Sequence, residues 1–152
     1  MIRYSICLPI LSALLLSGCV SIPAPAPSQT QLPLLQGEWT IKMIHSGGIM
    51  GLLRTIEISS DGSYVVMDER AGRTEQGQLS PEELASLVMR VSSMLYSAAA
   101  GPYSCADCFI YDIEIFGAEK PFTARVDDVT LGESGLGPLV TDLRAIIDRE
   151  LD

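Results

Sequence analysis

Apolar and polar residues alternate over several short stretches in the last two thirds of the chain, and this spacing is typical of half-buried strands. Asp61 and Gly62 form a hairpin signal between the second and third of these stretches. Glycines in the segment 46–51 separate the first stretch from the second. The pattern predicts strands at residues 39–44, 52–58, 63–68, 109–115 and 122–126.

Two other segments repeat apolar residues every three or four positions, as helices with one buried side do. The first begins at Ser80 and Pro81, a hydroxyl cap followed by proline at the first helical position, and is expected to end near Tyr96 or Ser97. The second begins at about Pro138. The predicted fold class is therefore α+β, an antiparallel sheet of four to five strands with two helices packed on one face.

The N-terminal residues have a different pattern, with Arg3 ahead of an apolar run from residue 6 to residue 16. This run is too short to span a membrane and has the form of a signal peptide. The residues that follow, Leu16, Ser17, Gly18 and Cys19, resemble the lipobox of bacterial lipoproteins. The expected organisation is a signal peptide at 1–18, an acylated Cys19 with a Pro- and Ala-rich tether at 19–34, and one domain at 35–152.

The charge of the chain narrows the possible partners. Its formal net charge is −9, and loss of Arg3 with the signal segment would leave −10. An acidic surface disfavours nucleic acid, so the expected membrane contact is the lipid anchor. The resulting location is the bacterial cell envelope. If the cell is Gram-negative, Val20 and Ser21 lack the aspartate of inner-membrane retention, which favours the outer membrane, facing the periplasm.

Four cysteines are present, and two of them fall in the N-terminal segment. Cys7 would leave with the signal peptide and Cys19 would be acylated, so Cys105 and Cys108 are left to pair in an oxidising compartment. A structural disulfide is the favoured state. Redox activity would require this pair at a helix start, and a zinc site would require further ligands; both remain open as weaker alternatives.

Candidate chemistry is otherwise sparse. His45 is the single histidine, with no evident nucleophile beside it, so no catalytic residue, cofactor or metal ligand is predicted and the chain is expected not to be an enzyme. Arg54 shares strand parity with apolar neighbours, which indicates snorkelling, a bulge, or pairing with an acid such as Asp127. Four carboxylates would form an acidic patch, a weak calcium site or simply a solvated sheet face: Asp112, Glu114, Asp127 and Asp128.

Several of these features occur together in the order found in one family. They are the run from Gly47 to Arg54, the proline-started helix, Asp107 with Phe109 and Tyr111, and the pair Asp127 and Asp128 before the last helix. In this respect the chain resembles emfourin-like proteins, small bacterial inhibitors of thermolysin-type zinc metalloproteases. The resemblance covers most of residues 45–151; the segment 59–79 is longer than in the family, and the lipid tether is an addition.

The resemblance implies an inhibitory contact made by an exposed loop. Gly47, Gly48 and Gly51 flank the apolar Ile49 and Met50, which suits a projecting contact loop; the same residues also suit an ordinary hairpin turn that covers the end of the sheet. Three hypotheses follow: an envelope-anchored inhibitor of a metalloprotease, a non-catalytic binding or assembly lipoprotein with another envelope protein as partner, and a thiol-disulfide component.

Overall fold

A computed structural model describes residues 28–98, 105–117 and 120–152. Its main feature is a six-stranded antiparallel sheet with the order β5-β4-β3-β2-β7-β8. A small second sheet pairs β1 with β6. The strands are β1 (Gln29–Gln31), β2 (Thr40–Gly47), β3 (Leu52–Ser59), β4 (Ser63–Asp68), β5 (Arg73–Gln78), β6 (Leu95–Ser97), β7 (Phe109–Phe116) and β8 (Phe122–Asp127).

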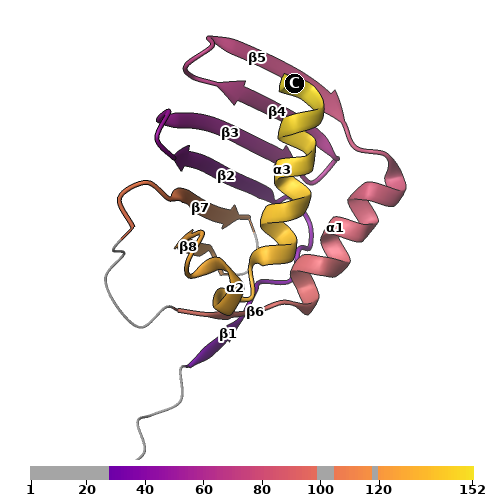
Figure 1. The fold of residues 1–152 in the computed structure, drawn as a ribbon. Helices are drawn as coiled ribbons and strands as arrows, with labels where there is room; N and C mark the ends of the chain where they lie inside the picture. The colour runs from indigo at the N-terminus through magenta and orange to yellow at the C-terminus, as the bar shows by residue number, and fades with distance from the viewer. Residues whose placement is uncertain (1–27, 99–104, 118–119) are drawn as a thin grey trace, which may run out of the picture.

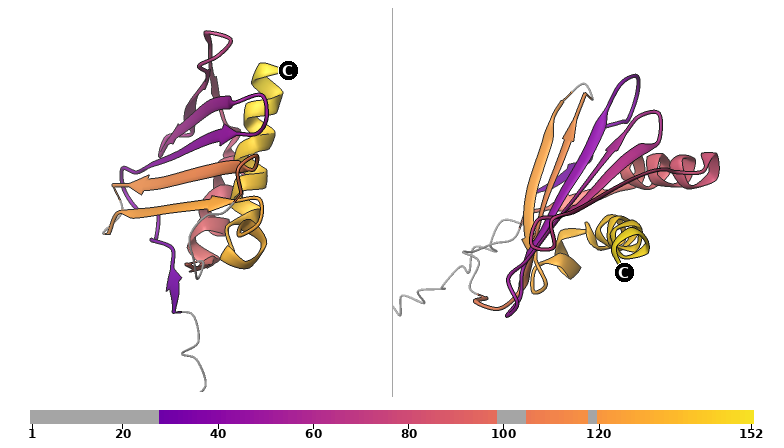
Figure 2. Two further views of the ribbon diagram at one scale, coloured as in Figure 1. Left: turned by 60° about the vertical axis from the view of Figure 1, so that its left-hand side comes forward. Right: turned by 90° about the horizontal axis from the view of Figure 1, so that it is seen from above.

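Three helices complete the fold: α1 (Pro81–Ser93), α2 (Leu131–Ser134) and α3 (Gly137–Leu151). Figure 2 shows α1 and α3 on the same side of the large sheet, and Figure 1 shows α3 crossing its strands. The α+β class and the antiparallel sheet agree with the sequence prediction. The count of four to five strands and two helices was wrong, because the structure adds β5, α2 and the two-stranded sheet.

The helix-facing side of the sheet carries the hydrophobic core. Each strand places every second side chain there, and α3 supplies the covering apolar stripe. Burying a dozen large aliphatic and aromatic side chains gives the fold its main stabilisation. The largest fully buried side chains are Tyr111, Leu32, Ile41, Met43, Ile56, Ile58, Ile113, Ile115, Leu136, Leu139, Leu143 and Ile147.

Helix α1 begins as its sequence predicts. The Ser80 side chain accepts a hydrogen bond from the Glu83 amide, and the Glu83 carboxylate accepts one from the Ser80 amide, so two otherwise unpaired donors are satisfied. The helix ends at Ser93 and not near Tyr96, because Met94 turns to an extended conformation and the next three residues form β6.

The packed part of the chain also extends upstream of residue 35, the expected start of the domain. Leu32 is 2% exposed and Leu35 is 7% exposed, and both belong to the core. The Leu32 amide donates to the Met94 carbonyl 3.2 Å away, which continues the pairing of β1 with β6. Residues 29–34, expected to belong to the tether, therefore lie against the domain.

Candidate functional site

The turn between β2 and β3 is the most exposed apolar feature among the described residues. Ile49 is 87% exposed and Met50 is 78% exposed. Gly47, Gly48 and Gly51 have φ values of +97°, +69° and +61°, a region that other residues rarely adopt, and the Gly51 amide donates to the Gly48 carbonyl at 2.9 Å. The glycines thus close a tight turn that points two large apolar side chains into solvent.

The base of this turn lies against the segment that leads into β7. The Gly48 amide donates to the Cys108 carbonyl at 3.1 Å. A Cβ atom on Gly47 would collide with the same carbonyl oxygen, and one on Gly48 would lie 2.6 Å from the Phe109 ring. Both glycines are therefore required by close packing as well as by their φ angles, and they hold the turn against its neighbour.

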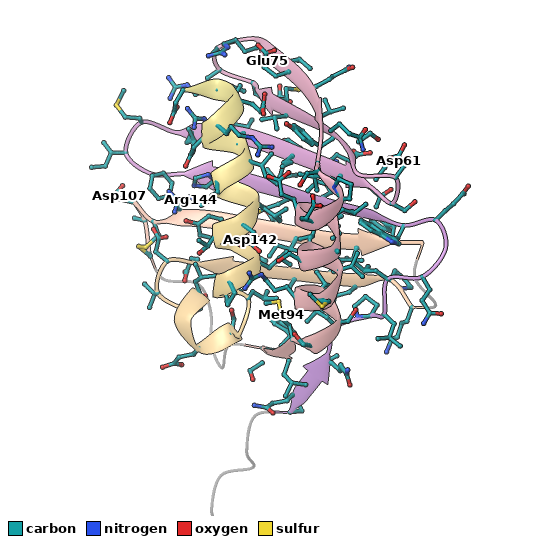
Figure 3. The ribbon with its side chains drawn as sticks, turned by 90° about the vertical axis from the view of Figure 1, so that its right-hand side faces the viewer. Asp61, Glu75, Met94, Asp107, Asp142 and Arg144 are labelled. Carbon is teal, nitrogen blue, oxygen red and sulfur yellow. A yellow bond between two sulfur atoms is a disulfide. The ribbon has the colours of Figure 1, made fainter. Side chains whose placement is uncertain are left out.

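That neighbour is the short loop closed by Cys105 and Cys108. The two sulfur atoms are at bonding distance and the Cα atoms are 5.5 Å apart, within the range of a disulfide, so the structure joins the pair expected to form one. Asp107, between them, is exposed, and Figure 3 places it at the same end of the domain as Arg144. The turn and the disulfide loop together form one edge, which we call the turn edge: residues 47–51 and 105–108.

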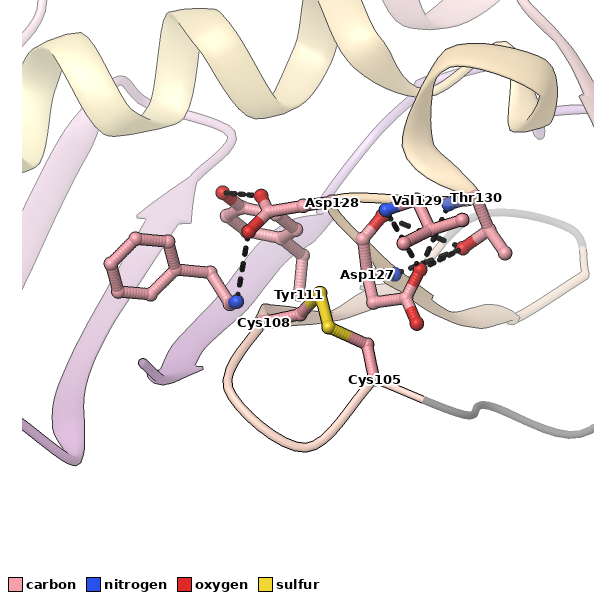
Figure 4. The surroundings of a disulfide bond; sticks show 8 residues. Cys105, Cys108, Tyr111, Asp127, Asp128, Val129 and Thr130 are labelled. Atoms are coloured by element: carbon pink, nitrogen blue, oxygen red, sulfur yellow. Dashed lines mark hydrogen bonds between the residues drawn. A yellow bond between two sulfur atoms is a disulfide. The ribbon is translucent and has the colours of Figure 1, made fainter. Parts of the chain in front are cut away.

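Two aspartates follow one another at the end of β8; Asp128 ties the start of β7, next to this edge, to β8, and Asp127 closes the turn after β8 (Figure 4). Asp128 accepts hydrogen bonds from the Phe109 amide at 2.9 Å and from the Tyr111 hydroxyl at 3.1 Å. Asp127 accepts from the Thr130 amide and hydroxyl, both at 2.8 Å, and these bonds lower the pKa of the Asp127 carboxyl. The pair is thus engaged in internal bonds, in a structural role.

A row of polar side chains runs across the helix-facing side of the sheet directly beneath the turn edge. Arg54 donates to Asp68 at 3.1 Å, to Asp148 at 3.3 Å and to Asp152 at 3.5 Å. Pairing with an acid, one of the three interpretations of Arg54, is therefore the one observed. Its partners are on β4, on α3 and at the residue that follows α3, and Asp127 is not among the bonded acids in the described part of the chain.

His45 lies in the same row and is 4% exposed. Its ring stacks on Tyr111 with centroids 4.9 Å apart and meets Phe109 edge-on at 5.0 Å. Burial, with added repulsion from Arg144 and Arg54, lowers the pKa of His45 to about 4, so the imidazole is neutral at pH 7. Its Nε2 atom has no hydrogen-bond partner among the described residues, and its burial keeps it out of reach of a substrate.

A separate hollow of about 250 Å³ lies between α1 and α3, with Leu79, Leu87 and Ile146 in its lining. Ion pairs join the two helices across it, Arg149 to Glu83 at 2.8 Å and Arg90 to Asp142 at 2.5 Å. These pairs tie the helices together at partly exposed positions, and the hollow is a groove between them.

The other residues singled out in the sequence are the carboxylates of β7, possible metal ligands and Cys19. Asp112 pairs with Arg125 at 3.0 Å on the outer face of the sheet, and Glu114 lies two residues further along the same strand, on the same face. Over the ranges 28–98, 105–117 and 120–152, no cluster of three or more His, Cys, Asp or Glu side chains is arranged to hold a metal ion. Cys19, expected to be acylated, lies outside the described residues, and none of the described helices is long and apolar enough to cross a membrane.

Sequence reasoning missed the contacts that support the turn, above all Cys108, Phe109 and Asp68. The pairing of β2 with β7 brings Cys108 and Phe109 to the turn, and the pairing of β3 with β4 places Asp68 opposite Arg54. Comparisons with known proteins assign no family: no protein-family model matches this chain, and no curated protein matches it.

Proposed function

We propose that this chain is a bacterial envelope lipoprotein, anchored through Cys19, whose domain inhibits a thermolysin-type metalloprotease through the turn at residues 47–51. The observation that carries the proposal is the exposure of Ile49 and Met50, 87% and 78%, at the tip of a turn that is fixed by its own backbone. The choice of target rests on the resemblance to emfourin-like proteins, and the anchor rests on the lipobox pattern.

The physical argument concerns what such a turn offers to a protease cleft. Exposed apolar side chains contribute most to binding when they are held in one position before contact, since less conformational freedom is then lost. The Gly48-to-Cys108 and Gly51-to-Gly48 hydrogen bonds hold the backbone on both sides of the tip, and the Arg70 guanidinium donates to the Gly51 carbonyl at 3.3 Å. Asp107 adds an exposed carboxylate on the same edge.

The test is hydrolysis of a peptide by a thermolysin-type metalloprotease in the presence of residues 19–152 carrying Cys19→Ser, which removes the acylation site. We expect inhibition that rises with dose and is lost in the double variant Ile49→Ser, Met50→Ser. Met89→Ser is the matched control, because Met89 is 68% exposed on α1 and outside the turn edge; it is expected to inhibit like the unchanged chain.

Two results would count against the proposal. The first is full proteolytic activity at micromolar concentrations of the unchanged chain. The second is equal loss of inhibition in the Met89→Ser control, which would indicate a general effect on the fold. Either result would leave a non-catalytic domain that presents the turn edge to another envelope component, and crosslinking from position 50 in envelope fractions would then identify that component.

A further inference from the structure

The pairing of β1 with β6 changes how far the domain can stand from its anchor. Gln29, Thr30 and Gln31 pair with Ser97, Tyr96 and Leu95, and the Gln31 side chain donates to the Ser92 carbonyl at 3.3 Å. With Leu32 and Leu35 in the core, the chain from Ser28 onward is committed to the domain. Only residues 20–27 then separate Cys19 from the domain.

This shorter spacer limits the height of the domain above a membrane. Nine Cα-to-Cα steps from Cys19 to Ser28 span at most about 30 Å, whereas a tether reaching residue 35 would span about 55 Å. A domain of this size has a diameter of the same order as the shorter value. The end of the domain that carries β1 is therefore kept near the lipid surface, and it is the end nearest to the anchor.

The strands at that end and the residues flanking them in the chain are uncharged, in an otherwise acidic chain. Residues 20–37 and 91–98 contain no Asp, Glu, Lys or Arg, although the chain has 19 acidic and 10 basic residues. The helix in contact with β6, α2, adds Glu133, and Lys120 lies two residues before Phe122, whose ring meets Tyr96 of β6 at 5.3 Å. Tyr96 of β6 also borders a hollow that Asp112, Glu114 and Arg125 line, so charges surround β1 and β6 without lying on them. An anionic lipid surface repels the acidic body more strongly than it repels these two strands.

Large apolar side chains are exposed there as well. Leu34 is 54% exposed just after β1, and Leu95 is 49% exposed in β6. Met89, 68% exposed, shares a surface hollow with Arg90, Ser92 and Ser93 at the end of α1, immediately before β6, and the Arg90 charge is paired with Asp142. A surface with few charges and with exposed leucine and methionine side chains suits the boundary between lipid headgroups and acyl chains.

We infer that the β1–β6 end of the domain rests on the lipid surface, with Leu34 and Leu95 entering the headgroup region. This inference depends on the lipid anchor at Cys19 that forms part of the proposed function. In Figure 1, β1 lies at the bottom of the domain and the β2–β3 turn at the upper left. A domain seated on β1 and β6 therefore keeps the turn edge away from the membrane, where a protein partner can reach it.

In the test, the chain is attached to lipid by chemical coupling, and the depth of single tryptophan side chains in the bilayer is measured. Residues 19–152 are coupled through the Cys19 thiol to a maleimide lipid in phosphatidylcholine and phosphatidylglycerol vesicles, with the Cys105–Cys108 disulfide kept oxidised. Tryptophan fluorescence is then compared with and without brominated acyl chains for Leu34→Trp, Leu95→Trp and the control Ile49→Trp. Trp39, 5% exposed, gives a constant background.

We expect the bromine-dependent quenching at positions 34 and 95 to exceed that at position 49 by about twofold or more, because only the first two enter the lipid. Adding Leu95→Glu to the Leu34→Trp chain should reduce the quenching, with circular dichroism confirming the fold. Equal quenching at all three positions, or none at 34 and 95, would overturn the inference.

The outcome is separable from that of the proposed function, since the coupling replaces biological acylation. Acylation itself is tested by incorporation of labelled palmitate in cells, with Cys19→Ser as the negative control, and inhibition is tested by the protease assay. Failure of either leaves the quenching result interpretable.

Discussion

The two ends of the large sheet differ on the side that faces the helices. At the end away from the turn edge, apolar cross-strand neighbours such as Ile58, Ile41 and Ile115 fill the row, and all three are fully buried. At the turn edge, the equivalent row holds Arg54, His45 and Tyr111. The first row stabilises the fold through the hydrophobic effect, which does not depend on orientation. The second row uses hydrogen bonds and ring contacts, which hold its side chains in fixed orientations.

This difference indicates which substitutions alter the fold and which alter the surface. The stabilisation from the apolar row depends on the volume of its side chains, and that from the polar row depends on their charge state and hydrogen-bond geometry. The side chains at the tip of the turn, Ile49 and Met50, are already in solvent, so the stability of the fold depends on them least. Stability measurements along this series should therefore show decreasing effects from core to turn.

The largest effect is expected for Ile113→Ala, in the middle of β7. Ile113 is fully buried, so the change removes apolar contact and leaves a cavity, at a cost of about 3 kcal/mol in the free energy of unfolding. Urea denaturation of residues 19–152 with Cys19→Ser would measure it. A cost below about 1 kcal/mol would mean that the site collapses around the smaller side chain.

A smaller effect is expected from protonation of His45. Its folded pKa of about 4 lies below the unfolded value of 6.5, so the unfolded chain binds more protons in this window and stability falls as the pH falls from 6.5 towards 4. The loss is about 2 kcal/mol, after allowing for solvent screening near the edge. Urea midpoints between pH 4 and pH 7 measure it.

The matched control for this titration is His45→Phe, which keeps an aromatic ring against Tyr111 and Phe109 but cannot take up a proton. Its stability should vary less between pH 6.5 and pH 4 than that of the unchanged chain. Curves of the same shape for both proteins would show that another group governs the loss.

Removal of the Asp128 side chain is expected to cost about 1 kcal/mol in stability. Asp128→Ala deletes the acceptor for the Phe109 amide and the Tyr111 hydroxyl, bonds whose net contribution is modest where water replaces them. Because Phe109 contacts Gly48, amide exchange in residues 47–51 should also quicken. Asp128→Asn keeps an acceptor oxygen, so its stability should fall between that of the unchanged chain and that of Asp128→Ala. If amide exchange in residues 47–51 were unchanged in Asp128→Ala, the Asp128 hydrogen bonds would not help to hold the turn.

The smallest effect is expected for the double variant Ile49→Ser, Met50→Ser, which should change the free energy of unfolding by less than about 0.5 kcal/mol. Both side chains are largely in solvent in the folded state, so folding gains little from them. Thermal unfolding would measure this. A loss above 1 kcal/mol would show that these residues cover the end of the sheet, the alternative reading of the turn.

The sequence predicts this core better than it predicts the edges of the fold. The start of α1 and the hairpin at Gly62 follow from local signals in Ser80, Pro81 and Asp61. Strand β5 has the sequence Arg-Thr-Glu-Gln-Gly-Gln, an edge strand with no apolar alternation, and β1 and β6 are three residues long. Strand β5 is defined by its hairpin with β4, and β1 and β6 are defined by pairing with each other across the chain. The spacing of apolar residues does not indicate any of these pairings.

The candidate site shows the same limit. The glycine run at 47–51 and the cysteine pair at 105 and 108 are visible in the sequence as separate motifs. Their contact is not, because it depends on β7 lying beside β2 and not beside β8 alone. For Arg54 the sequence identifies an unusual charge, but its partners Asp68 and Asp148 are 14 and 94 residues away.

The short pairing of β1 with β6 also has a mechanical consequence. Tension applied to the chain upstream of Ser28 reaches the domain first through three residue pairs and the buried Leu32 and Leu35, not through the six-stranded sheet. If that segment detaches, the eight residues 28–35 add about 27 Å of length before the load reaches β2. Under load, residues 28–35 would thus detach and extend first, while the turn edge stays folded.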